Sequence, residues 1–188
     1  MKVEETKLEG VLIIEPDVFR DSRGFFLETY QKDRYEKRGI KCDFVQDNHS
    51  RSVKGTIRGL HFQVSPAQDK LVRVTRGRVF DVAVDIREGS PTFGEWIGVE
   101  LSEENKKQLF VPVGFAHGFC ALDEINDFEY KCSSYYNPKT ENGIAWNDPD
   151  IGIEWPIENP ILSERDKNNQ SFQEYKKSPA FKYRRDSR

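Results

Sequence analysis

The chain has 188 residues, of which 36% are hydrophobic and 32% are charged, and its formal net charge at pH 7 is −3. This composition is typical of one well-charged globular domain and excludes an intrinsically disordered chain. No apolar run reaches the roughly 18 residues of a membrane helix, and the slightly acidic balance excludes a general attraction to nucleic acid.

Short strands separated by turn signals run through most of the chain. Strands are predicted at 11–14, 25–30, 70–75, 80–87, 96–101, 108–111, 117–122 and 128–133, and a short helix at 31–38. A further helix start is indicated by Ser163-Glu164-Arg165-Asp166, which has the S-x-x-D spacing. Many short strands with closely spaced turns predict an antiparallel β-sandwich or barrel, but they leave the strand order open.

The strand at 80–87 has the clearest alternation. Its apolar side chains fall on one face and Asp81, Asp85 and Arg87 fall on the other, which predicts a strand with one buried face. The preceding strand is connected to it through Arg76-Gly77-Arg78, where a glycine favours a tight hairpin.

No internal repeat or linker divides the chain, so a single domain over 1–188 is expected, with a basic C-terminal tail from about residue 175. The charges of that tail, which include Arg185 and Arg188, are interpreted as solvated surface.

The charged N-terminus lacks the apolar core of a signal peptide. The three cysteines form no CxxC pair and are interpreted as reduced thiols, so a cytoplasmic location is expected.

Two of the three histidines lie in glycine-rich segments. His61 lies in Arg58-Gly59-Leu60-His61-Phe62-Gln63, and His117 lies in Pro112-Val113-Gly114-Phe115-Ala116-His117-Gly118-Phe119. An imidazole suits proton transfer because its ordinary pKa of about 6.5 is close to physiological pH. A single histidine is more often a hydrogen-bonded structural residue, but the cationic and polar neighbours of these two favour a reactive site.

These segments resemble the paired motifs of the cupin superfamily. Gly55 stands five residues before His61-Phe62-Gln63, Gly77 closes the first motif, and Pro112, Gly114 and His117 form the second. Where a metal-binding cupin supplies about three histidines and a glutamate, this chain has Gln63 and a segment that carries Lys70. An ammonium group has no lone pair for a metal and repels a divalent cation. No metal is therefore expected.

Further segments resemble one cupin family, the dTDP-4-dehydrorhamnose 3,5-epimerases. The resemblance runs in order from about residue 5 to about residue 170. It rests on Phe19–Glu28, Gln46–Ser50, Gly55–Gln63, Lys70–Val72, Pro112–Phe119, Tyr130–Cys132, Tyr135-Tyr136, Glu141–Pro149 and Leu162–Asp166. The resemblance implies a jelly-roll fold and an enzyme that inverts carbons 3 and 5 beside the ketone of a dTDP-linked 6-deoxyhexose, without a cofactor.

The resemblance also implies roles for four catalytic residues. His61 matches the family's base, and Asp166 matches the carboxylate that orients it. Because Asp166 follows Ser163 at the spacing of a helix cap, a purely structural role remains an alternative. Tyr130 matches the proton donor on the opposite face of the sugar, and Lys70 matches the residue beside the ketone oxygen.

Substrate binding is implied at a larger set of positions. Arginine forks suit a diphosphate, and an aromatic ring suits thymine; Tyr136 matches the stacking residue, although the adjacent Tyr135 is an alternative. The matched binding residues are Arg23, Glu28, Gln46, Asp47, Asn48, Arg58, His117, Tyr136, Glu141 and Arg165. Arg165 stands where the family often has lysine.

The family is homodimeric with an exchanged N-terminal segment, so Arg23 and Glu28 are expected to complete the partner's site. Two alternatives remain open. A sibling that inverts only carbon 3 or only carbon 5 would keep the same residues, whereas a non-catalytic sugar-nucleotide-binding cupin would not need the histidine–carboxylate pair. The order of the inversions, the tolerance for other nucleotides and the downstream pathway are not determined by the sequence.

Overall fold

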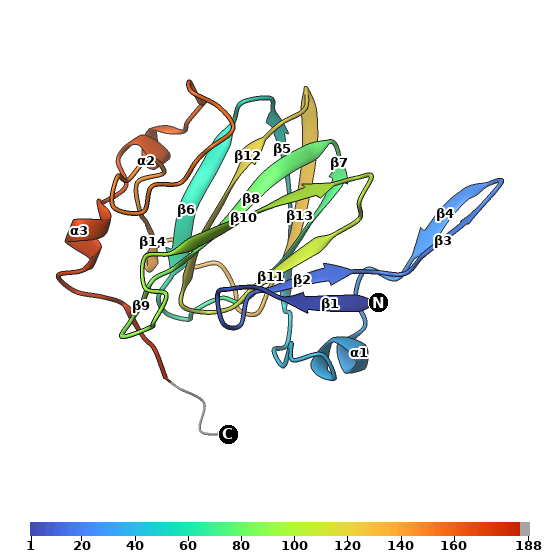
Figure 1. The fold of residues 1–188 in the computed structure, drawn as a ribbon, viewed down its shortest axis with the longest axis horizontal. Coiled ribbons are helices and arrows are strands. Elements are labelled where there is room, and N and C mark those ends of the chain that lie inside the picture. The colour runs from blue at the N-terminus through green and yellow to red at the C-terminus, as the bar shows by residue number, and fades with distance from the viewer. Residues whose placement is uncertain (185–188) are drawn as a thin grey trace.

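The computed structural model describes residues 1–184, which form two facing antiparallel β-sheets with short helices at the edges (Figure 1). The first sheet has the order β1-β2-β11-β7-β13-β5, formed by Lys2–Glu5, Leu12–Glu15, Gln108–Val111, Lys70–Arg76, Ile125–Cys132 and Gln46–Val53. The second has the order β10-β8-β12-β6-β14, formed by Trp96–Ser102, Arg78–Asp85, Phe115–Ala121, Ile57–Gln63 and Glu141–Gly143. The predicted antiparallel sandwich is confirmed.

Smaller elements surround the sandwich. Strands β3 (Val18–Asp21) and β4 (Gly24–Leu27) form a separate hairpin, and β9 (Arg87–Glu88) pairs in parallel with β15 (Phe181–Lys182). The short helix α1 (Lys32–Glu36) lies between β4 and β5, whereas α2 (Glu164–Lys167) and α3 (Phe172–Tyr175) come after the strands of the two large sheets. The helices expected at 31–38 and after Ser163 are therefore present. Within residues 1–184, no helix is long and apolar enough to cross a membrane. Arg185 and Arg188 of the predicted tail lie outside the described residues.

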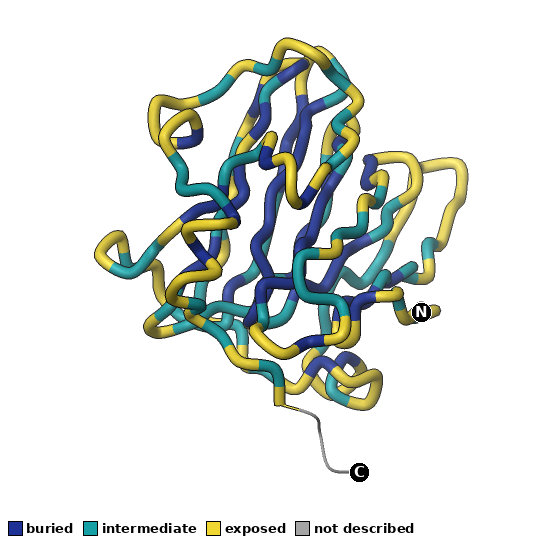
Figure 2. The backbone as a smooth tube through the Cα atoms, turned by 60° about the vertical axis from the view of Figure 1, so that its left-hand side comes forward, coloured by how far each residue is buried: buried dark blue, intermediate teal, exposed yellow. Residues whose placement is uncertain are grey.

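The main core lies between the two sheets (Figure 2). Val72, Leu109 and Phe128 of the six-stranded sheet pack there against Ala83 and Phe119 of the five-stranded sheet. Burying a valine, leucine or phenylalanine side chain contributes about 1.5 to 3 kcal/mol each. This packing fixes the spacing of the sheets around the pocket described below.

Strand β8 shows that the prediction of one buried face is wrong. Its apolar face does pack, but it packs on the outside of the sheet beneath a C-terminal cover that includes Phe172 and Tyr175. The opposite face is turned toward the other sheet, and Asp81 and Asp85 on it are 0% exposed. Alternation within one strand cannot reveal that a distant segment covers the outer face while the sandwich covers the inner one.

The tight hairpin expected at Arg76-Gly77-Arg78 is also wrong. Strand β7 belongs to the six-stranded sheet and β8 to the five-stranded sheet, so the glycine lies where the chain crosses between layers. Gly77 has a φ of 74°, and a Cβ there would lie 2.3 Å from the Ile125 carbonyl oxygen. The glycine is required for this close approach and not for a two-residue turn.

Two further glycines bring β6 and β12 close together. A Cβ on Gly59 would lie 2.5 Å from the Gly118 Cα, and one on Gly118 would lie 2.7 Å from the Arg58 carbonyl oxygen. The pairing of these strands places His117 opposite His61 and becomes irregular between His117 and Phe119. Directly opposed residues in an antiparallel pair point to the same face. The motif glycines therefore place both histidines side by side.

Candidate active site

A cavity of about 280 Å³, called the pocket below, is lined by residues from both sheets and from the segment around α2. Its lining consists of Ser50, Arg58, His61, Lys70, His117, Phe119, Phe128, Tyr130, Ser163, Arg165 and Asp166. All four residues expected to be catalytic are among them, although they come from β6, β7, β13 and α2 and are separated by up to 105 positions between His61 and Asp166.

His61 and Asp166 form a hydrogen-bonded pair in the pocket. The His61 Nε2 atom lies 2.5 Å from Asp166 Oδ1, and the Ser163 hydroxyl donates to Asp166 Oδ2 at 2.8 Å. Ser163 is also the N-cap of α2, because its Oγ accepts the backbone N–H of Asp166 at 3.1 Å. The predicted cap is thus made by Ser163, and the Asp166 side chain is left to contact the histidine.

The surroundings of Asp166 favour an ionised carboxylate. Burial acts to raise its pKa, but the hydrogen bond and charge of His61, with smaller contributions from Ser163 and Arg165, hold the pKa below its usual range. An ionised Asp166 keeps the imidazole proton on the His61 Nε2 atom. The other ring nitrogen, Nδ1, then carries a lone pair and has no hydrogen-bond partner within residues 1–184.

Lys70 and Tyr130 supply a cation and a phenol to the same pocket. Burial lowers the pKa of Lys70, and the acidic groups of Cys132, Glu141 and Asp81 partly oppose this effect. Burial raises the pKa of Tyr130 to about 12. The phenol therefore stays protonated throughout the neutral pH range.

His117 has a carboxylate partner that the sequence pattern placed on a solvent face. Its Nε2 atom lies 2.8 Å from Asp81 Oδ1, and the His117 ring stacks on Phe128 with 6.2 Å between the ring centroids. Asp81 is fully buried, and its Oδ2 atom has no hydrogen-bond partner among the described residues. The signal that could have identified Asp81 is an acidic residue with two apolar residues on either side, Val79 and Phe80 before it and Val82 and Ala83 after it.

Polar and cationic side chains surround the entrance of the pocket. Arg58 is exposed and donates to Ser52 Oγ at 3.0 Å, which directs its guanidinium. Glu141 accepts hydrogen bonds from Arg165 at 2.5 Å and from the Tyr136 hydroxyl at 2.7 Å. These three expected binding residues, Tyr136, Glu141 and Arg165, are called the entrance cluster below.

The expected binding residues Gln46, Asp47 and Asn48 are consecutive in strand β5, so their side chains alternate between its two faces. Gln46 accepts the Tyr136 backbone N–H at 2.9 Å and donates to Asn48 at 3.0 Å, so Gln46 and Asn48 are linked to the entrance cluster through Tyr136. Asp47 points to the opposite face, where it pairs with Lys131 at 2.9 Å. Both Tyr135 and Tyr136 are exposed, by 69% and 53%, and only Tyr136 contacts Glu141.

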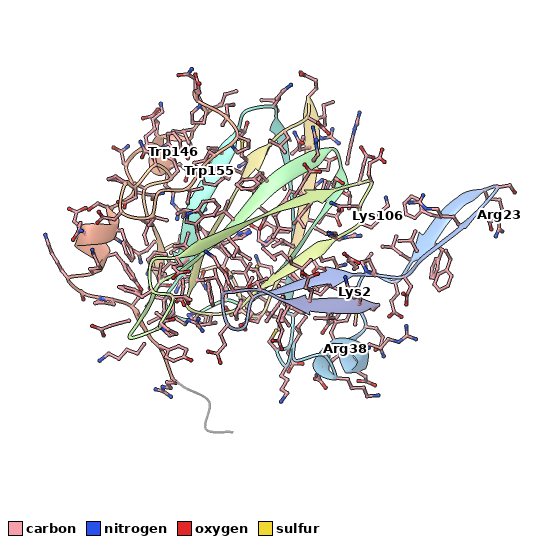
Figure 3. All side chains as sticks on the ribbon, viewed as in Figure 1. Lys2, Arg23, Arg38, Lys106, Trp146 and Trp155 are labelled. Atoms are coloured by element: carbon pink, nitrogen blue, oxygen red, sulfur yellow. The ribbon has the colours of Figure 1, made fainter. Side chains whose placement is uncertain are left out.

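Arg23 and Glu28 are not brought to the pocket of their own chain. Figure 3 shows Arg23 at the tip of the projecting β3–β4 hairpin, and its side chain is 88% exposed. It pairs there with Asp21 at 2.6 Å, while Glu28 pairs with Arg34 at 3.1 Å.

The residues described by the structure, 1–184, contain no group of three or more His, Cys, Asp or Glu side chains arranged to hold a metal ion. The expectation of a metal-free site stays a prediction, and elemental analysis of the purified protein tests it.

Comparison with known proteins identifies a consistent set of relatives. The family model of dTDP-4-dehydrorhamnose 3,5-epimerase matches residues 5–174. The enzyme of that name from Shigella flexneri is 56% identical over 92% of this chain and 96% of its own length. A Legionella pneumophila epimerase, solved in complex with dTDP-4-keto-L-rhamnose, aligns with a TM-score of 0.95 and 48% identity over 98% of this chain and 99% of its own.

A relative with a narrower activity is also similar. The dTDP-4-dehydrorhamnose 3-epimerase from Streptomyces niveus is 42% identical over 89% of this chain and 82% of its own length. The solved epimerase structures share the sandwich described above, so the expected cupin, or jelly-roll, fold is confirmed.

Proposed function

This chain belongs to the dTDP-4-dehydrorhamnose 3,5-epimerase family, and we propose that His61, Asp166, Lys70 and Tyr130 carry out the family's reaction in the pocket. The enzyme inverts carbons 3 and 5 of dTDP-4-dehydro-6-deoxy-glucose to give dTDP-4-dehydro-rhamnose. The observation that carries the assignment of residues is that a histidine–carboxylate pair, a half-buried lysine and a half-buried tyrosine line one cavity.

The reaction begins with removal of a proton from a carbon beside the ketone. The Nδ1 lone pair of His61 takes this proton, and Asp166 stabilises the resulting imidazolium. The electron pair of the C–H bond forms a C=C bond, and negative charge develops on the ketone oxygen. The Lys70 ammonium lies in the same pocket and stabilises that charge.

Inversion then requires a proton from the opposite face of the sugar ring. The Tyr130 hydroxyl donates this proton to the carbon, where the electron pair of the C=C bond forms the new C–H bond. An electron pair of the enolate oxygen re-forms the C=O bond, and Tyr130 is left as a phenolate. Proton exchange with solvent resets His61 and Tyr130 before the second carbon reacts. Exchange with solvent is the reason that deuterium from heavy water reports each inversion.

We assign substrate binding to the residues around the entrance. Arg58 and Arg165 suit the diphosphate because a guanidinium can donate two parallel hydrogen bonds to phosphate oxygens. Tyr136 offers an exposed ring for the thymine, held by its hydroxyl contact with Glu141 and by the backbone contact with Gln46. Asn48 and His117 border the sugar. Asp47 lies on the outer face and contributes to binding only through the strand it belongs to.

The Tyr130→Phe variant should separate proton exchange from inversion. Without the phenol, His61 can still remove a proton and return deuterium to the same face. Substrate recovered from heavy water should therefore carry deuterium with its original configuration, and turnover to inverted product should fall about 10²-fold. Proton and deuterium NMR of the recovered sugar measures both quantities.

The pH dependence of this variant supplies its control. A raised pKa means that the neutral phenol persists to higher pH, so Tyr130, with a pKa of about 12, should not cause the alkaline decline of kcat. The alkaline limb should lie at the same pH in wild type and Tyr130→Phe. A limb that disappears in the variant, or inversion at the normal rate, would show that another group donates the proton.

The mono-epimerase activity is the second candidate, because a 3-epimerase is among the similar proteins and such a sibling would keep the same four catalytic residues. Deuterium at carbon 3 alone, after complete exchange, would favour that activity. The single-carbon enzyme needs the same base and donor, so it leaves the assignment of residues unchanged.

We also propose that the enzyme is a homodimer in which the β3–β4 hairpin reaches the partner's pocket. The hairpin stands away from the sandwich (Figure 1). Phe19 and Phe26 are directly paired across it and are 64% and 69% exposed. A two-stranded hairpin is marginally stable alone, and an exposed aromatic pair indicates an interaction surface.

A mixed dimer tests this arrangement. Arg23→Ala should weaken binding in the partner's pocket, whereas His61→Ala should inactivate its own. Co-expression of the two variants, each with a different affinity tag, should give a mixed dimer with one intact pocket and with activity that neither parent dimer has. A mass of 21.9 kDa, that of one chain, or a mixed dimer without activity would contradict the proposal.

A cytoplasmic location is part of the same proposal. It is supported by Cys42, Cys120 and Cys132, which are free thiols in the described chain, because reduced cysteines are typical of a reducing compartment.

A further inference from the structure

The pocket contains two histidine–carboxylate pairs, and their carboxylates have different surroundings. Asp166 accepts hydrogen bonds from His61 and from the Ser163 hydroxyl. Asp81 has His117 as its one hydrogen-bond partner in the described chain, and its Oδ2 atom is buried without any. An ionised carboxylate with an unpaired, buried oxygen is costly. The two pairs are therefore expected to hold different numbers of protons.

The neighbours of Asp81 support this difference. Its hydrogen-bond partner His117 belongs to β12, and the cation Lys70 belongs to β7. The stacked apolar rings of Phe119 and Phe128 line the same pocket. Burial raises the pKa of Asp81, while His117 and Lys70 act in the opposite direction. For Asp166, burial also acts to raise the pKa, but the hydrogen bond and charge of His61 outweigh it, and the pKa is lowered. Two similar pairs are thus biased toward opposite protonation states.

A buried pair is most stable with no net charge. In such a pair, either Asp81 is protonated and donates to His117 Nε2, or Asp81 is ionised and His117 is an imidazolium. Both descriptions place a proton on the remaining ring nitrogen, Nδ1, which has no hydrogen-bond partner in the described chain. His117 lines the pocket, so this N–H is available to substrate.

We propose that Asp81 and His117 share a neutralising proton, and that Asp81 is a positioning residue that keeps His117 Nδ1 protonated as a hydrogen-bond donor to the sugar ketone. The identity of the acceptor rests on the proposed function, whereas the position of the proton does not. The pair adds a second donor beside Lys70 for the charge that develops on the oxygen. It also explains why one of two adjacent histidines acts as the base and the other does not.

Nitrogen NMR of the protein without substrate tests the position of the proton. In protein labelled with ¹⁵N-histidine, the His49→Gln and His117→Phe variants assign the three rings. At pH 7, His117 Nδ1 should give the signal of a protonated ring nitrogen, and His61 Nδ1 that of an unprotonated one. An unprotonated His117 Nδ1 would overturn the proposal. A protonated His61 Nδ1 would instead contradict the assignment of the base, so the two failures are distinguishable.

A double-mutant cycle tests whether Asp81 acts through His117. His117→Phe, which preserves ring stacking, should lower kcat by about 10²-fold, as expected for the loss of one donor. Asp81→Asn should lower kcat by about tenfold with KM nearly unchanged, because it weakens the donor without removing it. When Asp81→Asn is added to His117→Phe, kcat should not fall further.

The matched control is Asp85→Asn, which removes another fully buried carboxylate from the same face of β8. Asp85 binds Arg87, Ser90 and Thr92 and lies outside the pocket lining. Its variant should keep the wild-type kcat, with folding checked by thermal unfolding. If Asp81→Asn reduces kcat equally in the presence and absence of the His117 ring, Asp81 has only a structural role and the proposal fails.

Discussion

Replacing His61 with alanine should lower kcat by about 10²- to 10⁴-fold, the usual cost of losing a general base. The loss should affect both carbons, because one base serves both inversions. Binding of the nucleotide sugar should change little, since Arg58 and the cluster of Tyr136, Glu141 and Arg165 lie at the entrance. Steady-state kinetics and calorimetric titration with dTDP separate these two effects.

The control for this variant is His49→Ala. His49 lies on the outer face of β5, where its side chain is 54% exposed and its Nε2 is 3.2 Å from Asp127. The control variant should keep near-normal kcat. Near-normal turnover in His61→Ala would show that the base is another residue, and His117 would then be the first alternative to examine.

The Asp166→Asn variant should also lose most activity, by about 10²- to 10⁴-fold in kcat. An amide preserves the size of the side chain but no longer fixes the imidazole proton on Nε2, and the corresponding change in a serine protease costs about 10⁴-fold. KM should remain close to the wild-type value, because Asp166 contacts His61 and Ser163. Measurement of kcat and KM for both variants in one assay makes the comparison direct.

The stability of Asp166→Asn should depend on pH in a defined direction. The folded-state pKa of Asp166 is lowered, so the ionised carboxylate stabilises the fold above the ordinary carboxyl pKa of about 4. That stabilisation is lost as the pH falls through the lowered pKa. The difference in unfolding free energy between wild type and variant should therefore shrink in acid. Glu164→Gln, an exposed change in the same helix, should show neither effect, and an equal loss of kcat there would indicate that α2 had merely been disturbed.

Much of the sandwich could be predicted because its signals are local. Alternating side chains mark β8, and the S-x-x-D spacing marks the start of α2, where Ser163 does cap the helix. The predictions that were wrong concern features that depend on segments distant in the sequence. Gly77 was expected to form a hairpin, but it serves a crossing between sheets that is constrained by Ile125. The outer face of β8 is buried by residues more than eighty positions later, such as Phe172.

In the pocket, too, residues within recognisable motifs could be predicted, whereas contacts between distant strands could not. Ordered motifs indicated His61, Lys70, Tyr130 and Asp166, and the fold collects these residues in one cavity. Asp81 was interpreted as a solvent-facing residue because its partner, His117, lies on another strand and 36 positions away. The separation of Arg23 from the pocket of its own chain was expected from the family resemblance and not from any local pattern, and the hairpin that carries Arg23 projects away from the sandwich.

The reaction of dTDP-4-keto-6-deoxy-glucose with the purified enzyme in deuterated water, followed by NMR of the recovered sugar, decides whether this protein inverts both carbons. We expect deuterium at both carbon 3 and carbon 5 in the inverted product, with neither label appearing in the His61→Ala variant. Tight binding of the nucleotide sugar with no deuterium at either carbon would contradict this expectation and would indicate a binding protein.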